Sequence, residues 1–187
     1  MVHLKRSIVE VKAKENCLAH ALIISIPKLT NDSDYIAFRK GCKIRRVVDH
    51  LLATTGIVLS NGGGIAELIS FQECFKEYKI VVFGGLGCEE IVFDGQMESE
   101  KRINLFYDDV KHHFHVISSV TGALSRKYFC KGCNKGYESG VTHRCKESCS
   151  DLCQSHHVHT LMFESRARHV IDSLEVVHVL SDIRLTR

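Results

Sequence analysis

The features that this sequence lacks set the first limits on its function. It has one proline, no tryptophan and no low-complexity stretch, so no flexible linker is evident along its 187 residues. The longest apolar run, Ala19 to Pro27, is interrupted by His20 and Ser25 and is too short for a transmembrane helix. The N-terminal residues carry charges and do not form a signal peptide. We therefore expect no membrane partner and an intracellular location, nuclear or cytoplasmic.

Cysteine usage limits the chemistry further. Nine cysteines are an odd number, which argues against a complete disulfide framework, and clustered Cys and His in a reducing compartment favour metal binding. Five of the nine lie between residues 130 and 153, in the spacing C-x2-C, nine residues, H-x-C, three residues, C, three residues, C. A Cys-x-x-Cys pair on a tight turn places two thiolates on one metal, and a His-x-Cys pair closes the tetrahedron. We predict a structural zinc site, with the candidate ligands Cys130, Cys133, His143, Cys145, Cys149 and Cys153.

The sequence does not decide which ligands hold the zinc. The simplest set joins the first cysteine pair to His143 and Cys145 and leaves Cys149 and Cys153 in reserve or for a partial second site. The alternative joins the first pair to Cys149 and Cys153. A catalytic metal is not expected, because a closed, sulfur-rich set has no open position for water. The lysines and arginines among these ligands alternate with aromatic residues, a pattern that suits contacts with DNA and equally a solvated surface.

The hydrophobic periodicity changes near Lys79. Before it, helical spacing predicts four helices, over residues 17–27, 35–38, 44–56 and 65–75. After it, alternating and β-branched segments predict four strands, near residues 79–83, 91–93, 102–107 and 113–117. We expect an α+β domain in which the helices pack on a small, mostly antiparallel sheet arranged as a β-meander. The predicted units are this domain, the zinc-binding segment and a divergent tail, over residues 1–120, 121–153 and 154–187.

Cys17 and His113 form a candidate nucleophile and base. Cys17 opens the first predicted helix, where unpaired backbone N–H groups and the helix dipole stabilise a thiolate. His113 begins a strand late in the sequence, and a histidine from a distant strand can take the proton of a thiol. The alternative is a small buried cysteine and a histidine in a solvated strand.

The residues around this pair resemble a known peptidase family. Glu15-Asn16-Cys17-Leu18-x-x-Ala21 is similar to the nucleophile segment of ovarian-tumour (OTU) type cysteine peptidases, in the papain-like superfamily, which typically reads Asp-Gly-Asn-Cys-Leu-x-x-Ala. The strand at 113–117 resembles the family's closing strand, which begins with the catalytic histidine. The likeness covers about residues 10–118. It implies an OTU-like fold, Cys17 and His113 as catalytic residues, and a ubiquitin-like protein as a partner.

The sequence departs from the OTU pattern at Lys14 and His115. Lys14 stands where the family usually has the aspartate of its oxyanion loop, and His115 stands where an Asp or Asn would orient the catalytic imidazole. Loss of the orienting residue of a triad lowers activity strongly. We therefore expect a weak or inactive peptidase, with Asp108 or Asp109 as the residues that would have to compensate.

A second resemblance covers more of the sequence. Its motifs, in order, are residues 17–22, 78–82, 100–107, 113–117 and 128–145. Together they resemble the N-terminal region of protein-primed family B DNA polymerases of Polinton/Maverick-type transposons and related viral or organellar elements. In that family an OTU-like region and a Cys/His segment precede the exonuclease and polymerase domains, whose motifs these 187 residues lack. The last cysteine pair, Cys149 and Cys153, is wider than the family's Cys-x-x-Cys.

The sequence leaves three functional hypotheses. The first is a truncated N-terminal module of such a polymerase, with a weak OTU-like domain and a structural zinc site that docks to DNA or to a polymerase-associated protein. The second is an active OTU-type cysteine peptidase, and the third is a nucleic-acid-binding zinc-finger protein. Lys14 and His115 favour the first over the second, and the small net charge of +3 favours it over the third.

Overall fold

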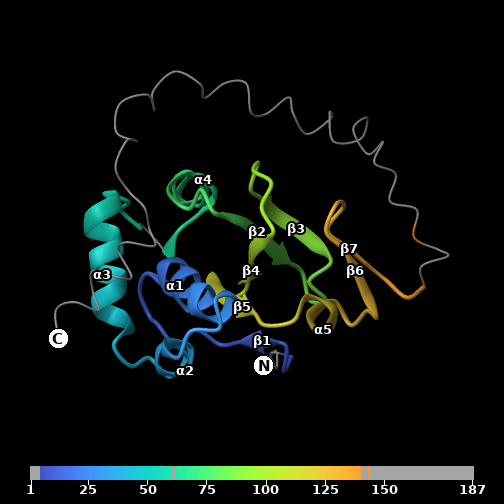
Figure 1. Ribbon diagram of the computed structural model, residues 1–187, viewed down its shortest axis with the longest axis horizontal. Helices are drawn as coiled ribbons and strands as arrows, with labels where there is room; N and C mark the ends of the chain where they lie inside the picture. The colour runs from blue at the N-terminus through green and yellow to red at the C-terminus, as the bar shows by residue number, and fades with distance from the viewer. Residues whose placement is uncertain (1–4, 60–61, 140–142, 144–187) are drawn as a thin grey trace, which may run out of the picture.

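The computed structural model describes residues 5–59, 62–139 and 143 (Figure 1). Its helices are α1 (Cys17–Leu29), α2 (Asp34–Arg39), α3 (Ile44–Thr55), α4 (Ile65–Cys74) and α5 (Val120–Leu124). Its strands are β1 (Ile8–Val9), β2 (Tyr78–Gly84), β3 (Glu90–Asp94), β4 (Lys101–Asp108), β5 (His113–Ile117), β6 (Tyr128–Cys130) and β7 (Lys135–Tyr137). The α+β class, the four predicted helices and the four predicted strands are confirmed. The first helix extends two residues beyond Pro27, the last predicted position.

The main sheet is mixed and has the strand order β1-β5-β4-β2-β3. The pairings β1–β5, β4–β5 and β2–β3 are antiparallel, and β2–β4 is parallel. The expected β-meander is therefore wrong, although most pairings are antiparallel. A meander would place β3 between β2 and β4, whereas β3 lies at the outer edge.

Hydrogen bonds at the start of β2 limit its pairing with β3. On the β3 side, the Gln72 amide of α4 accepts a hydrogen bond from Ile80 N and donates one to the Tyr78 carbonyl, both at 2.8 Å. These bonds take the place of further pairing with β3. The chain leaves β3 at Gly95, whose N–H donates to the Ile80 carbonyl of β2 at 2.8 Å. A Cβ at Gly95 would lie 1.9 Å from the Gln72 side-chain oxygen, so only glycine allows this close crossing toward β4.

The sheet has an apolar layer on each face. Ile80 and Val82 of β2 belong to the larger core, shared with α1 to α4, and Val81 and Phe83 belong to a smaller core. In Figure 1 helices α1 to α4 lie on one side of the sheet, and α5 and the β6–β7 hairpin lie on the other. This two-sided burial explains why every residue of β2 is buried and why Ile80 to Phe83 are all apolar.

Helix α1 connects the core to the candidate site. Most of its side chains are buried, and it packs against β4 and β5. The start of the helix therefore reaches the end of the sheet where β5 begins. No helix in the described ranges is long and apolar enough to cross a membrane.

Candidate active site and metal centre

The predicted nucleophile and base lie beside each other. Cys17 is the first residue of α1 and is 3% exposed. The ring of His113, at the start of β5, is close enough to the Cys17 thiol to shift the pKa of both groups, and the thiol donates a hydrogen bond to the Gly62 carbonyl at 3.7 Å. The structure therefore brings together two residues that the sequence separates by most of the domain.

The electrostatic environment shifts the pKa values of both groups in the direction of a thiolate and an imidazolium. Burial raises the pKa of Cys17, but the hydrogen bond and charge of His113, with backbone N–H groups of Phe114 and Leu18, lower that pKa below its ordinary value of 9.0. The hydrogen bond with Cys17 raises the pKa of His113 above 6.5 in spite of burial, and the carbonyl of Val11 and the charge of Asp108 add to the increase. Opposite shifts of this kind characterise an activated thiol.

The carbonyl of Val11 orients the His113 ring. Nε2 of His113 lies 2.8 Å from Val11 O. A carbonyl oxygen only accepts hydrogen bonds, so Nε2 must carry a proton, and Nδ1 is the nitrogen left for the Cys17 thiol. Asp108 does not take this role, because its carboxylate accepts from the backbone N–H groups of Val110 and Lys111, both at 3.1 Å. A main-chain oxygen thus does what a carboxylate or amide side chain does in a triad.

His115 holds Val11 from the other direction. Nδ1 of His115 accepts a hydrogen bond from Val11 N at 3.2 Å, so this ring is neutral with its proton on Nε2. Burial, followed by the charge of His113, lowers the pKa of His115 to about 4. Both histidines are therefore hydrogen-bonded to Val11: His115 accepts from its N–H, and His113 donates to its carbonyl. His115 is a positioning residue that acts on His113 through Val11.

The segment before Cys17 turns sharply into the helix. Asn16 has a left-handed backbone conformation, with φ 54° and ψ 33°. Its carbonyl accepts from the His20 backbone N–H and from the His20 ring Nδ1, both at 3.0 Å. These bonds fix the turn that presents the first backbone N–H groups of α1. Lys14, the second departure from the OTU pattern, is exposed.

A glycine segment limits access to the thiol. The Gly62 carbonyl lies 3.7 Å from Cys17 Sγ, and a Cβ at Gly62 would lie 3.6 Å from both Sγ and the carbonyl oxygen of His112. Gly62 has φ +86° and Gly63 has φ +102°, conformations that L side chains rarely adopt. A Cβ at Gly63 would lie 2.8 Å from the Leu18 side chain. The backbone of Gly62 thus lies directly against the thiol, where a larger residue would contact Sγ.

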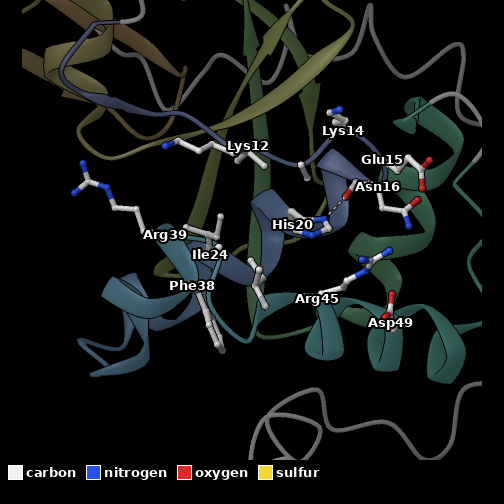
Figure 2. A pocket seen from close by; sticks show the side chains of 14 residues that line it. Lys12, Lys14, Glu15, Asn16, His20, Ile24, Phe38, Arg39, Arg45 and Asp49 are labelled. Carbon is white, nitrogen blue, oxygen red and sulfur yellow. Dashed lines mark hydrogen bonds between the residues drawn. The ribbon is translucent and has the colours of Figure 1, made fainter.

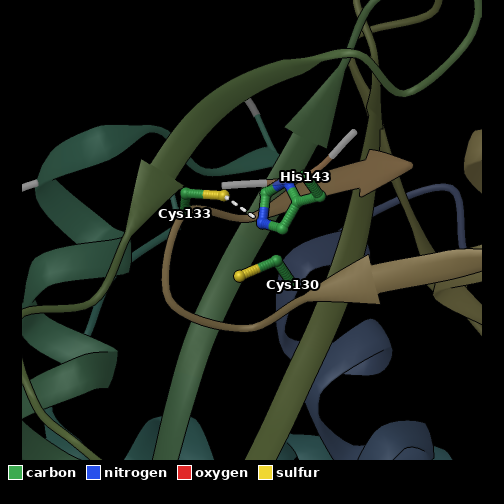
Figure 3. Close-up of side chains that lie close together, drawn as sticks. All are labelled: Cys130, Cys133 and His143. Carbon is green, nitrogen blue, oxygen red and sulfur yellow. Dashed lines mark hydrogen bonds between the residues drawn. The ribbon is translucent and has the colours of Figure 1, made fainter. Parts of the chain in front are cut away.

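Cys130, Cys133 and His143 form a cluster that could hold a metal ion. Their ligand atoms all lie within 4.8 Å of one another, and Cys133 Sγ lies 3.7 Å from His143 Nε2 (Figure 3). Zn–S bonds of about 2.3 Å in a tetrahedron give ligand–ligand distances of about 3.8 Å. Figure 3 shows the two sulfurs and the imidazole pointing toward one another. The remaining predicted ligands, Cys145, Cys149 and Cys153, lie outside the described residues.

The metal cluster is attached to the main sheet through the β6–β7 hairpin. Asn134, at φ 52° between the strands, donates to Asp94 and accepts from Arg102, both at 2.9 Å. Phe129 packs edge-on against Phe83 of β2, with ring centroids 6.2 Å apart. The predicted tight turn at the first cysteine pair is therefore present, and it is fixed to the domain by polar and apolar contacts.

No protein-family model matches the sequence, and neither a curated protein nor a solved structure matches it. The geometry of the two sites therefore carries the functional argument. The sequence indicated Cys17, His113 and the cluster, but it did not indicate Val11 or Gly62 as parts of the active site. Val11 acts through its main chain, which leaves no side-chain signature. Gly62 has no side chain, so it also carries no sign of its position beside the nucleophile.

Proposed function

We propose that this protein is a cysteine hydrolase of the OTU type, with Cys17 as the nucleophile and His113 as the general base and acid. The observation that carries this proposal is the proximity of the Cys17 thiol to a His113 ring whose Nε2 is fixed by Val11 O, with opposite pKa shifts in the two groups. The sequence departure at His115 argued for inactivity. The orienting contact through Val11 is an observation that supports activity in spite of that departure.

The proposed reaction is acyl transfer in two steps. The Cys17 thiolate adds to the carbonyl carbon of the substrate, and the C–N bond breaks as His113 gives its proton to the leaving amine. Water then adds to the thioester while His113 takes a proton from it, and the thiolate leaves to regenerate the pair. Backbone N–H groups in the first turn of α1 lack intrahelical partners and suit the oxyanion that forms at each addition.

The narrow approach to the thiol supports a substrate with a small acyl residue. The position of a Cβ at Gly62 lies 3.6 Å from both the thiol sulfur and the carbonyl oxygen of His112, so there is little space beside the thiol on this side. A C-terminal Gly-Gly acyl group, as in ubiquitin-like proteins, has no side chain to clash there. We therefore propose an amide or isopeptide bond after glycine as the scissile bond.

The cluster at Cys130, Cys133 and His143 supports a second proposal, a structural zinc site. Together with the order of motifs, it supports an origin in the N-terminal region of a transposon-type family B DNA polymerase. In this proposal the zinc fixes the chain beyond β7 to the hairpin and takes no part in the hydrolysis. A polymerase reading frame in register with this sequence in the adjoining DNA would support the origin, and unrelated adjoining DNA would argue against it.

A ubiquitin probe with an electrophilic C-terminus tests the hydrolase. We expect one adduct per chain on wild type, none on Cys17→Ala or His113→Ala, and normal labelling of Cys42→Ser, which removes an exposed cysteine outside the pair. A matched probe in which the last residue is valine should label poorly. Absence of any adduct with the ubiquitin probe, or an adduct that survives Cys17→Ala, would contradict the proposal.

A further inference from the structure

A second concave site lies beside the proposed catalytic centre. A pocket of about 510 Å³ is formed by the segment before α1, the exposed face of α1, and the corner between α2 and α3. Figure 2 shows His20 at its centre, with Lys14 and Glu15 above and Arg45 below. Val11 and Asn16 line the pocket, whereas Cys17 and His113 do not. It is thus separate from the thiol but shares the segment that orients His113.

The pocket carries an excess of positive charge. Four of its lining residues are cationic, Lys12, Lys14, Arg39 and Arg45, and two are acidic, Glu15 and Asp49. The four cationic side chains make no ion pair or hydrogen bond within the described parts of the chain. Cationic side chains that line a hollow without carboxylate partners suit an anion.

The positive charge continues outside the pocket along the α2–α3 corner. Five of the eight residues from 39 to 46 are lysine or arginine, and all five are exposed. The apolar residue among them, Ile44, is buried in the core, so α3 keeps its apolar face inward and its cations outward. This basic corner, defined as residues 39–46, therefore extends the positive surface beyond one bound anion.

We propose that this pocket and the basic corner bind the phosphate backbone of a single-stranded nucleic acid. The guanidinium forks of Arg39 and Arg45 suit two phosphate oxygens each. The run of further cations suits a polymer that carries a phosphate at every residue. Glu15 and Asp49, which also line the pocket, offer acceptors for the amino groups of unpaired bases, which favours a single strand. The proposal goes beyond the hydrolase and places nucleic acid at α2–α3 rather than at the metal cluster.

Fluorescence anisotropy with a labelled oligothymidylate tests this site. Arg39→Gln/Arg45→Gln should bind about tenfold more weakly for each guanidinium lost. The slope of log affinity against log salt should become shallower by about 1.4, since each single-strand phosphate contact contributes about 0.7. Both arginines are exposed, so the double variant is expected to keep the thermal stability of wild type, which a melting curve checks.

The matched control is Lys76→Gln/Lys127→Gln, which removes the same charge from exposed positions that do not line the pocket. It should keep wild-type affinity. A loss in the control equal to that of the arginine variant would place the binding elsewhere and overturn the proposal. The proposal would also be overturned by undetectable binding at low salt, or by polyglutamate that competes as well as polyphosphate, which would identify an acidic protein as the occupant.

Discussion

Replacing His113 by alanine should slow modification of Cys17 sharply. Burial raises the pKa of wild-type Cys17, but the interaction and charge of His113, together with the backbone N–H groups of Phe114 and Leu18, outweigh it and lower that pKa below its ordinary value. A hydrogen bond to a charged group contributes about 1.5–3 kcal/mol, so its loss should lower the thiolate population at pH 7 by about ten- to a hundredfold. Without His113, burial remains the largest influence and raises the pKa of the thiol.

The assay is the rate of iodoacetamide alkylation of Cys17, followed by peptide mass spectrometry at several pH values. Cys74 and Cys88, whose pKa values are raised mainly by burial, serve as internal references. His112→Ala is the matched control, because this neighbouring histidine is exposed and its ring bonds to the Tyr107 hydroxyl. An alkylation rate in His113→Ala equal to that in wild type would refute the reasoning.

Three further predictions concern acid stability, metal binding and access to the thiol. His115→Asn should reduce the loss of folding stability in acid. In the wild type the buried His115 ring has a pKa of about 4, against about 6.5 in the unfolded chain, so the folded state binds this proton less readily. The free energy of unfolding should therefore fall by up to about 3 kcal/mol as the pH drops from 6.5 to 4, and the variant should lack this contribution. Cys130→Ser should lose the zinc that wild type holds at one or more per chain, measured by elemental analysis. Gly62→Ala should lower stability by about 1–2 kcal/mol, because its φ is +86°, and should also slow labelling of Cys17.

Each of these variants has a control or a contradicting result. The free energy of unfolding, measured with denaturant at several pH values, should fall less steeply between pH 6.5 and 4 in His115→Asn than in wild type. The same dependence on pH in both proteins would contradict the first prediction. Retention of zinc by Cys130→Ser would contradict the second, and Cys42→Ser should retain it. Gly41→Ala shares the positive φ of +83° but has open space around its Cβ, so it should be destabilised without slower labelling. Equal labelling rates in the two glycine variants would exclude a role of Gly62 at the thiol.

Local sequence patterns predicted most of the elements of this fold. The apolar stripe that begins at Ile44 has the spacing of a helix and matches α3. The β-branched run that ends at Phe83 has the length of a strand and matches β2. The strand order was not predictable in the same way. The strand order depends on the Gln72 amide and on the close packing at Gly95. These contacts join segments that are separate in the sequence, and the hydrophobic pattern of one segment does not indicate which other segment it contacts.

The active site shows the same division. Cys17 and His113 stand at the start of a helix and of a strand, positions that the sequence marks, and the structure brings them together. The sequence pointed to His115 as a loss of function, because a histidine cannot replace a carboxylate beside an imidazolium. The structure shows instead that the His115 ring bonds to Val11 N–H and that Val11 O bonds to His113. Almost every residue type has the same backbone N–H and carbonyl, so the sequence does not show that Val11 makes these contacts.

The most direct test of the account is the ionisation of His113 in wild type and in Cys17→Ala, followed by ¹⁵N chemical shifts of the ring nitrogens against pH. The account predicts an imidazolium in wild type that loses its proton at a higher pH than in Cys17→Ala, because the hydrogen bond with Cys17 is the largest influence that raises the pKa of His113. In the variant, the neutral ring should keep its proton on Nε2, toward Val11 O. The same titration midpoint in both proteins, or a neutral ring protonated on Nδ1, would contradict the proposed nucleophile and base.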